Sequence, residues 1–289
     1  METVPKLAVG GFTIALLSDG FWYNDGGCMF GVVPRPLWQR EHPADQHNRV
    51  RLGLCCPLIM RGGEAILVDT GIGNRLGEVE RRIFEHGEGR LLDGFKALGV
   101  EPGDVTGVVL SHLHFDHCGG LVRRRNSGRL EASFPGARIF VQRGEVETAT
   151  GARNERLKAA YRHVAECLGP IEDKLEQIQG DCELIPGVRA TVTGGHTRDH
   201  QVVIVRDGDA GLAHLADVVP TRSHLRGPWN QAYDLDPLRT MEAKAELLQA
   251  AARAGVWVSF AHDERLLAAR MRQDGVGLRI VEEIGACAE

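Results

Sequence analysis

The sequence lacks the features of a membrane-spanning, repetitive or secreted protein. No apolar segment among its 289 residues is long enough to cross a bilayer, so we expect no membrane contact. No internal repeat or low-complexity segment is present, which argues against a solenoid or an array of linked units. The apolar stretch 7–17 is interrupted by Gly10 and Gly11 and has no small-residue cleavage site, so it predicts a first β-strand rather than a signal peptide.

A disulfide framework is also lacking. The seven cysteines form no Cys-x-x-Cys pair, and their odd number favours reduced thiols in a reducing compartment. We therefore expect a cytoplasmic protein. The cysteines are Cys28, Cys55, Cys56, Cys118, Cys167, Cys182 and Cys287.

An extended basic surface is absent as well. The formal net charge is −5 and the basic residues are scattered, so nucleic acid is not an expected partner. The exception is the run Arg123, Arg124 and Arg125, which precedes the turn-forming residues 126–128. We interpret this run as part of a solvated loop, with an anion-binding site as the alternative.

Potential metal ligands are dense in one short stretch, 111–117, directly after the apolar run 108–110. His112 and His114 lie two residues apart, so in an extended segment they project to the same side and can hold one ion. Asp116 and His117 point elsewhere and predict a second ion beside the first. A histidine-rich surface loop is the alternative interpretation.

Three further ligand-type residues each follow an apolar run later in the chain. His196 follows 189–193 through two glycines that let the backbone turn sharply, Asp217 follows 212–216, and His262 follows 257–261. These partners strengthen the prediction of a dinuclear centre. Because the set contains imidazole and carboxylate but no thiolate, we expect zinc, with manganese, iron or cobalt as alternatives that the same ligands suit.

With these residues the sequence resembles the metallo-β-lactamase superfamily, whose signature is a His-x-His-x-Asp-His loop followed by a distant His, a bridging Asp and a final His. The resemblance covers about residues 19–262 and implies two ions. The first would be held by His112, His114 and His196, the second by Asp116, His117 and His262, with Asp217 bridging them. It also implies that Asp69, in the turn after the apolar run 66–68, orients ligands without binding metal.

The same resemblance implies an αββα sandwich, an α/β fold in which two mixed β-sheets are flanked by helices. The chain length suits a single domain of this kind over residues 1–289. The hydrophobic pattern predicts a helix at 238–254 and a central helical stretch. It predicts strands at 13–17, 54–60, 65–68, 105–110, 138–141, 202–206 and 211–215.

A pair of neighbouring ions indicates hydrolysis. Two cations lower the pKa of a bridging water, so that hydroxide forms near neutral pH, and they polarise the carbonyl or phosphoryl oxygen under attack. Asp116 is the predicted catalytic residue, accepting the hydroxide's proton and passing it to the leaving group. The non-enzymatic alternative, a binding module without metal, is disfavoured because every ligand position is filled.

The segment 25–38 is rich in glycine, proline and large apolar residues. Its Met29, Phe30 and Trp38 predict either an apolar wall over the metal site or a contact in a homodimer. Together with 216–221 and 229–237, this segment resembles the branch that contains YtnP-type quorum-quenching lactonases and methyl parathion hydrolases. The resemblance implies an N-acyl homoserine lactone as the substrate, with aryl esters or phosphotriesters as the alternative.

One position departs from the lactonase pattern. The well-studied lactonases carry a tyrosine three residues beyond the bridging Asp, where it can hydrogen-bond the substrate, and this sequence has Pro220. Another donor is needed in its place. The candidates are Tyr23, Tyr233 and His224, the last because its loop follows the bridging Asp.

Overall fold

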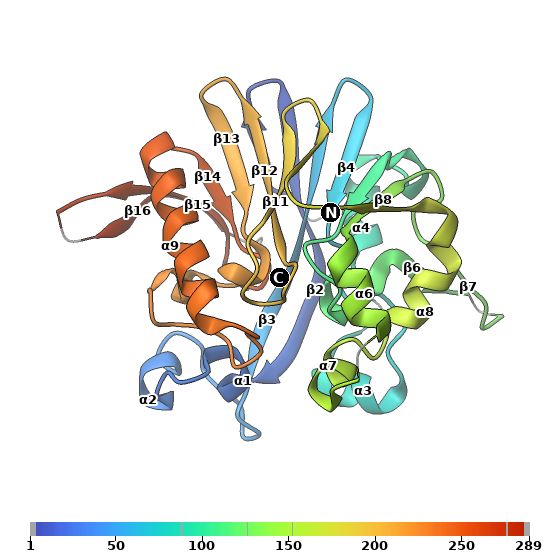
Figure 1. Cartoon of the computed structure of the whole chain (residues 1–289), viewed down its shortest axis with the longest axis horizontal. Helices are drawn as coiled ribbons and strands as arrows, with labels where there is room; N and C mark the ends of the chain where they lie inside the picture. The colour runs from blue at the N-terminus through green and yellow to red at the C-terminus, as the bar shows by residue number, and fades with distance from the viewer. Residues whose placement is uncertain (1–3, 88, 126, 152, 276, 286–289) are drawn as a thin grey trace.

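The computed structural model describes residues 4–87, 89–125, 127–151, 153–275 and 277–285. Within these ranges two seven-stranded β-sheets face each other and carry helices on their outer surfaces, as Figure 1 shows. The predicted αββα sandwich is therefore confirmed. No helix in these ranges is both long and apolar enough to span a membrane. Cys287 lies outside the described residues, and the other six cysteines are free thiols.

The first sheet is mixed and has the order β1–β2–β3–β4–β5–β8–β9. Strands β1 to β4 pair antiparallel, whereas β4, β5, β8 and β9 pair in parallel. The strands are β1 Lys6–Val9, β2 Phe12–Asp25, β3 Arg49–Arg61, β4 Glu64–Val68, β5 Gly107–Val109, β8 Arg138–Gln142 and β9 Leu175–Ile178. The apolar N-terminal stretch thus forms strands, as predicted.

The second sheet follows chain order from β10 to β16. Its neighbours pair antiparallel except for β13 and β14, which are parallel. The strands are β10 Cys182–Ile185, β11 Val188–Val192, β12 Gln201–Asp207, β13 Ala210–His214, β14 Trp257–Ser259, β15 Leu266–Gln273 and β16 Leu278–Gly285. The predicted strands at 202–206 and 211–215 correspond to β12 and β13.

Buried aliphatic side chains hold the layers together. Ile14, Ile66 and Val109 of the first sheet pack against Val203 and Leu212 of the second, all less than 2% exposed. Burial of such side chains is worth about 1.5–3 kcal/mol each before the entropy cost of folding. The space between the sheets is therefore filled with side chains, and ligands are confined to its rim.

Helices cover the outer face of each sheet (Figure 1). Phe95 of α4 and Cys167 of α8 pack against the first sheet, and α9 covers the second. Helix α9 begins where the Asp236 side chain accepts a hydrogen bond from Arg239 N, and ends at Gly255 in the left-handed conformation. The helices are α1 Gly26–Phe30, α2 Arg35–Trp38, α3 Glu78–Phe84, α4 Leu91–Leu98, α5 Phe115–Cys118, α6 Arg143–Gly151, α7 Glu155–Ala160, α8 Val164–Leu168 and α9 Pro237–Ala254.

The arginine run lies in a small hairpin formed by β6 (Val122–Arg124) and β7 (Leu130–Ala132). Arg123 and Arg125 each approach the Glu131 carboxylate at 2.6 Å. Arg124 is exposed and donates to the Gly128 carbonyl oxygen at 3.4 Å. Two of the three guanidinium groups thus share one carboxylate partner within the hairpin, which favours the solvated-loop interpretation over an anion site.

Candidate metal centre

The ligand-type residues predicted from the sequence all follow strands that end at the same rim of the sandwich. The loop 111–117 follows β5, His196 follows β11, Asp217 follows β13, and His262 follows β14. Gly194 and Gly195 turn the chain before His196 with φ of 64° and 89°. A Cβ on Gly195 would lie 2.6 Å from Thr240 N, so this position accepts only glycine. The chain thereby delivers side chains from both sheets to one place.

The seven predicted ligands form three overlapping groups in which the candidate ligand atoms lie within 4.8 Å of one another. All are buried except His114, which is half-buried. The groups are His112, His114 and His196; Asp116, His117 and His262; and His112, His117 and Asp217. The first two coincide with the two sites that the sequence predicts.

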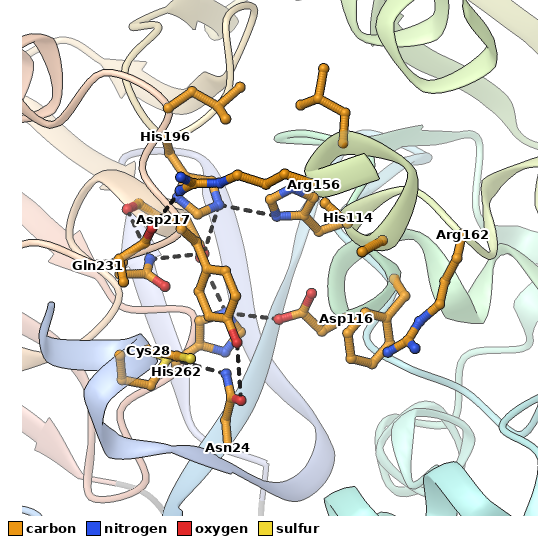
Figure 2. A pocket seen from close by; sticks show the side chains of 18 of the residues that line it. Asn24, Cys28, His114, Asp116, Arg156, Arg162, His196, Asp217, Gln231 and His262 are labelled. Carbon is orange, nitrogen blue, oxygen red and sulfur yellow. Dashed lines mark hydrogen bonds and ion pairs between the residues drawn. The ribbon is translucent and has the colours of Figure 1, made fainter. Parts of the chain in front are cut away.

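Asp217 lies between these two sites. Its Oδ1 is 3.1 Å from His262 Nε2 and 3.2 Å from His117 Nε2, and its Oδ2 is 3.3 Å from His196 Nε2. One carboxylate oxygen therefore faces each side of the cluster. Figure 2 shows Asp217, His196 and His262 meeting at the edge of a pocket. This is the geometry that a bridging carboxylate requires.

The nitrogen lone pairs of the cluster fit a cation. Nδ1 of His117 donates to Asp69 Oδ2 at 2.8 Å, and Nδ1 of His262 donates to the Gly53 carbonyl oxygen at 3.0 Å. The two Nε2 atoms, only 3.1 Å apart, then face each other as acceptors. Nε2 of His112 is buried without a partner among the described residues, which costs about 1–3 kcal/mol if nothing binds it. The residues present therefore fit divalent metal.

Protonation states agree with this fit. Burial, reinforced by neighbouring imidazoles, lowers the pKa of His112 and of His114 well below the ordinary value, so both are neutral at pH 7. Burial also opposes protonation of His117, but the surrounding carboxylates, Asp217 foremost, outweigh it and hold the pKa of His117 well above its ordinary value. The cluster thus combines the neutral imidazoles of His112 and His114 with carboxylates that favour positive charge beside His117, carried either by a proton or by a bound cation.

Further polar side chains orient the ligands from behind. Asp234 Oδ1 accepts from His196 Nδ1 at 2.9 Å, as Asp69 does from His117. Gln231 Nε2 donates to Asp217 Oδ2 at 3.0 Å. Such contacts fix which ring nitrogen is free to bind metal. Asp69 stands where the sequence predicts an orienting carboxylate, whereas Asp234 and Gln231 were not predicted.

A pocket of about 380 Å³ opens over the cluster. His114, Asp116, His196, Asp217 and His262 line its polar side. An aromatic wall lines another side, with ring centroids 5.1–5.7 Å apart, and consists of Trp22, Phe84 and Phe115. The pocket therefore places a polar, metal-binding floor beside an apolar wall.

Comparison with known proteins identifies the family. The model of the metallo-beta-lactamase superfamily matches residues 56–130 and 132–262. The chain belongs to the metallo-beta-lactamase superfamily. An N-acyl homoserine lactonase from Bacillus cereus is 31% identical over 182 residues, which are 58% of this chain and 64% of that protein. The chain thus matches a little under two thirds of that relative's length.

Two solved structures share the fold over almost the whole chain. A probable metal-dependent hydrolase from Staphylococcus aureus superposes with a TM-score of 0.90 at 29% identity, covering 98% of this chain and 100% of that one. AidC, a dizinc quorum-quenching lactonase in complex with a product, superposes with a TM-score of 0.79 over 97% of both chains. At 21% identity, the likeness to AidC shows the fold alone.

Only some of the residues predicted to contact substrate line the pocket. Met29 and Tyr233 line it. Phe30 and Trp38 do not: they stack on each other at 5.1 Å and are 0% and 2% exposed, because α1 and α2 fold back on the sheet and bury them. The expectation that these two contact substrate or a second subunit is corrected.

Two candidate donors also lie outside the pocket. His224 is 1% exposed, stacks on Phe30 and faces the Met29 carbonyl oxygen at 2.9 Å, so it holds its own loop in place. Tyr23 packs against the Arg49 guanidinium, 5.3 Å from the ring centroid. Of the three candidates for the missing tyrosine, only Tyr233 reaches the pocket.

Glu145 of α6 is a buried link that sequence reasoning missed. Its Oε2 accepts from Leu113 N and from the Tyr161 hydroxyl, both at 3.1 Å, and its Oε1 accepts from the Thr197 hydroxyl. Leu113 separates His112 from His114, and Thr197 follows His196. One carboxylate therefore ties together the two loops that carry the first metal site. No signal in the sequence distinguishes this residue from an exposed helical glutamate.

Proposed function

We propose that this protein is a dinuclear metal-dependent hydrolase that opens the lactone ring of N-acyl homoserine lactones. The observation that carries the proposal is the position of Asp217, whose two carboxylate oxygens face the two halves of a histidine cluster in the pocket. The similarity to an N-acyl homoserine lactonase supports the substrate class. The pocket supports it too, because a small ester ring suits the polar floor and an acyl tail suits the aromatic wall.

Two divalent cations bound by the seven ligands would lower the pKa of a water and polarise the ester carbonyl. Asp116 lines the pocket with its Oδ2 3.4 Å from His262 Nε2. We propose that its carboxylate takes one proton as the water oxygen attacks the ring carbonyl carbon. The ring C–O bond then breaks, and the same proton passes to the leaving oxygen, which gives a hydroxyl and a carboxylic acid. The acid releases the second proton of the water to solvent and becomes a carboxylate.

The finer properties are proposals of the same kind. Zinc is the proposed native metal because the imidazole and carboxylate ligands suit it and the structurally similar AidC is a dizinc lactonase. One domain over residues 1–289 is proposed, and a cytoplasmic location is favoured by the six free thiols of the described residues.

A homodimer is supported by the apolar side chains of Val32 and Leu37, which are 90% and 46% exposed. A small ester or lactone is the proposed partner, with neither nucleic acid nor membrane.

Metal analysis and a substrate panel test the proposal together. Protein expressed with ample zinc should hold about two ions per chain. It should hydrolyse acyl homoserine lactones faster than aryl esters or phosphotriesters. Turnover of phosphotriesters with untouched lactones would overturn the substrate class, and one ion or none would overturn the dinuclear centre. Asp217→Ala should lose both metal and turnover, whereas Asp209→Ala, on an exposed turn, should keep both.

A further inference from the structure

Arg156 is a cationic pocket residue that the proposed reaction has not used. It lies on α7, and its guanidinium lines the pocket together with His114, His196 and Asp217. Nη2 donates to the Ala232 carbonyl oxygen at 2.5 Å. A guanidinium has five N–H donors, and the described residues provide this one partner, so donors remain for a ligand.

Two other polar side chains of the pocket already use their donors within the protein. Gln231 Nε2 donates to Asp217, and the Tyr233 hydroxyl donates to Asn24 Oδ1 at 3.2 Å. Arg162 also lines the pocket, but its charge is paired with the Glu80 carboxylate, 3.6 Å from its Nε, whereas the partner of Arg156 is a neutral carbonyl. With Pro220 in the position of the lactonase tyrosine, Arg156 is therefore a pocket cation whose charge is left to serve an anionic substrate group.

The placement of Arg156 makes one part of the pocket cationic and leaves the aromatic wall apolar. In Figure 2 Arg156 extends from α7 beside His114 and His196, while Asn24 and Cys28 lie at the opposite end. The aromatic wall lies on the His262 side, where the Trp22 ring is 6.0 Å from the His262 ring. A molecule with an oxygen-rich end and an apolar tail would thus lie with its oxygens near Arg156 and its tail along the wall.

We propose that Arg156 is a specificity residue that binds the carboxylate formed when the lactone ring opens. This inference rests on the proposed function. Hydrolysis adds one water to a neutral ester and leaves a hydroxyl and a carboxylate, with one proton released to solvent, so negative charge develops only on the reacting ester group. A guanidinium matches the two oxygens of a carboxylate with two parallel N–H donors. The bond to Ala232 O anchors the guanidinium in the pocket that His114 and His196 also line and limits its motion.

Three variants test the proposal: Arg156→Met, Arg156→Lys and, as a matched control, Lys158→Met. Lys158 is also a cation on α7, but it pairs with Glu155 at 2.8 Å and does not line the pocket. Binding of N-hexanoyl-homoserine is measured by calorimetry on zinc-loaded protein. Its neutral methyl amide serves as the comparison ligand, and metal content is determined in parallel.

We expect Arg156→Met to bind the carboxylate product at least tenfold more weakly than wild type and the amide within twofold. Arg156→Lys should bind the carboxylate product with an affinity between those of Arg156→Met and wild type. Lysine keeps the positive charge but lacks the two parallel N–H donors of the guanidinium. Lys158→Met should match wild type for both ligands. A merely structural role would weaken both ligands equally, and that result would overturn the proposal.

Kinetics separate this proposal from the one on which it rests. Arg156→Met should lower kcat/KM for hexanoyl homoserine lactone at least tenfold, with unchanged metal content. If wild type hydrolyses the lactone and Arg156→Met equals it in kcat/KM and in product binding, only the role of Arg156 is refuted. If metal-replete wild type does not hydrolyse lactones at all, the proposed function fails, and the role of Arg156 fails with it.

Discussion

Replacement of Asp69 by asparagine tests whether the carboxylate behind His117 controls the second metal site. Asp69 Oδ1 accepts from Ser111 N at 2.7 Å, and Oδ2 accepts from Ser111 Oγ and His117 Nδ1, both at 2.8 Å. Asp69 has φ of 56°, a left-handed conformation that asparagine also tolerates. The variant therefore keeps the shape of the residue and changes only the charge and one acceptor.

The side-chain amide introduced by Asp69→Asn cannot satisfy all three donors. If its NH₂ faces His117, the ring proton moves from Nδ1 to Nε2, the nitrogen that points at Asp217 and His262. If the amide flips, its NH₂ faces the N–H of Ser111 instead. In both cases the second metal site loses a well-ordered ligand. Loss of such supporting contacts lowers metal affinity roughly 10- to 100-fold, or about 1.4–2.8 kcal/mol.

Zinc titration of the metal-free protein against a competing chelator measures this loss. Asp69→Asn should weaken one of two binding steps, and Asp234→Asn should weaken the other, because Asp234 supports His196 at the first site. The control Asp209→Asn, on an exposed turn, should bind both ions like wild type. If both zinc-binding steps of Asp69→Asn have the affinities of wild type, the idea that the Asp69 carboxylate sets the tautomer of His117 is refuted.

Three further outcomes are expected. Glu145→Gln should destabilise the protein by about 1–3 kcal/mol in urea unfolding, because one of its donors from Leu113 or Thr197 loses its acceptor. Burial lowers the pKa of His224 to about 3, below the ordinary 6.5, so unfolding takes up a proton between these values. Stability should therefore fall as pH drops through that window, by about 1.4 kcal/mol per pH unit from this group. His224→Gln should reduce the measured pH slope by one proton, and an unchanged slope would contradict the argument. Removal of metal by a chelator should lower Tm, with recovery on adding zinc, as calorimetry can show.

The metal-binding pattern was predictable because it is local in sequence. The spacing of His112, His114, Asp116 and His117 and the apolar runs before the later ligands can be read without coordinates. Strand geometry then brings the residues that follow β4 and β5 together, because these strands are parallel and their carboxyl ends lie at the same edge of the sheet. The register pairs Val68 with Val109, which brings Asp69 beside the start of the ligand loop. Local pattern and sheet geometry together suffice for this part of the site.

The supporting residues were not predictable because their partners are distant in sequence. Glu145 lies 32 residues from Leu113 and 52 from Thr197, and nothing in its own helix indicates burial. Phe30 and Trp38 mislead for the converse reason. Large apolar side chains in a loop suggest an exposed wall, but here they are buried by the return of the chain through α1 and α2. Side-chain environment of this kind depends on the tertiary fold alone.

The site also explains why the sandwich needs both sheets. The ligand loop 111–117 comes from the first sheet, whereas His196, Asp217 and His262 come from the second. Each predicted ion therefore has ligands from both sheets, and Asp217 contacts ligands from both. Because the interior is filled by packed aliphatic side chains, the sheets cannot slide without cost, and the two halves of the site are held in register. Function at the rim thus depends on packing in the interior, although none of the ligands belongs to that aliphatic core.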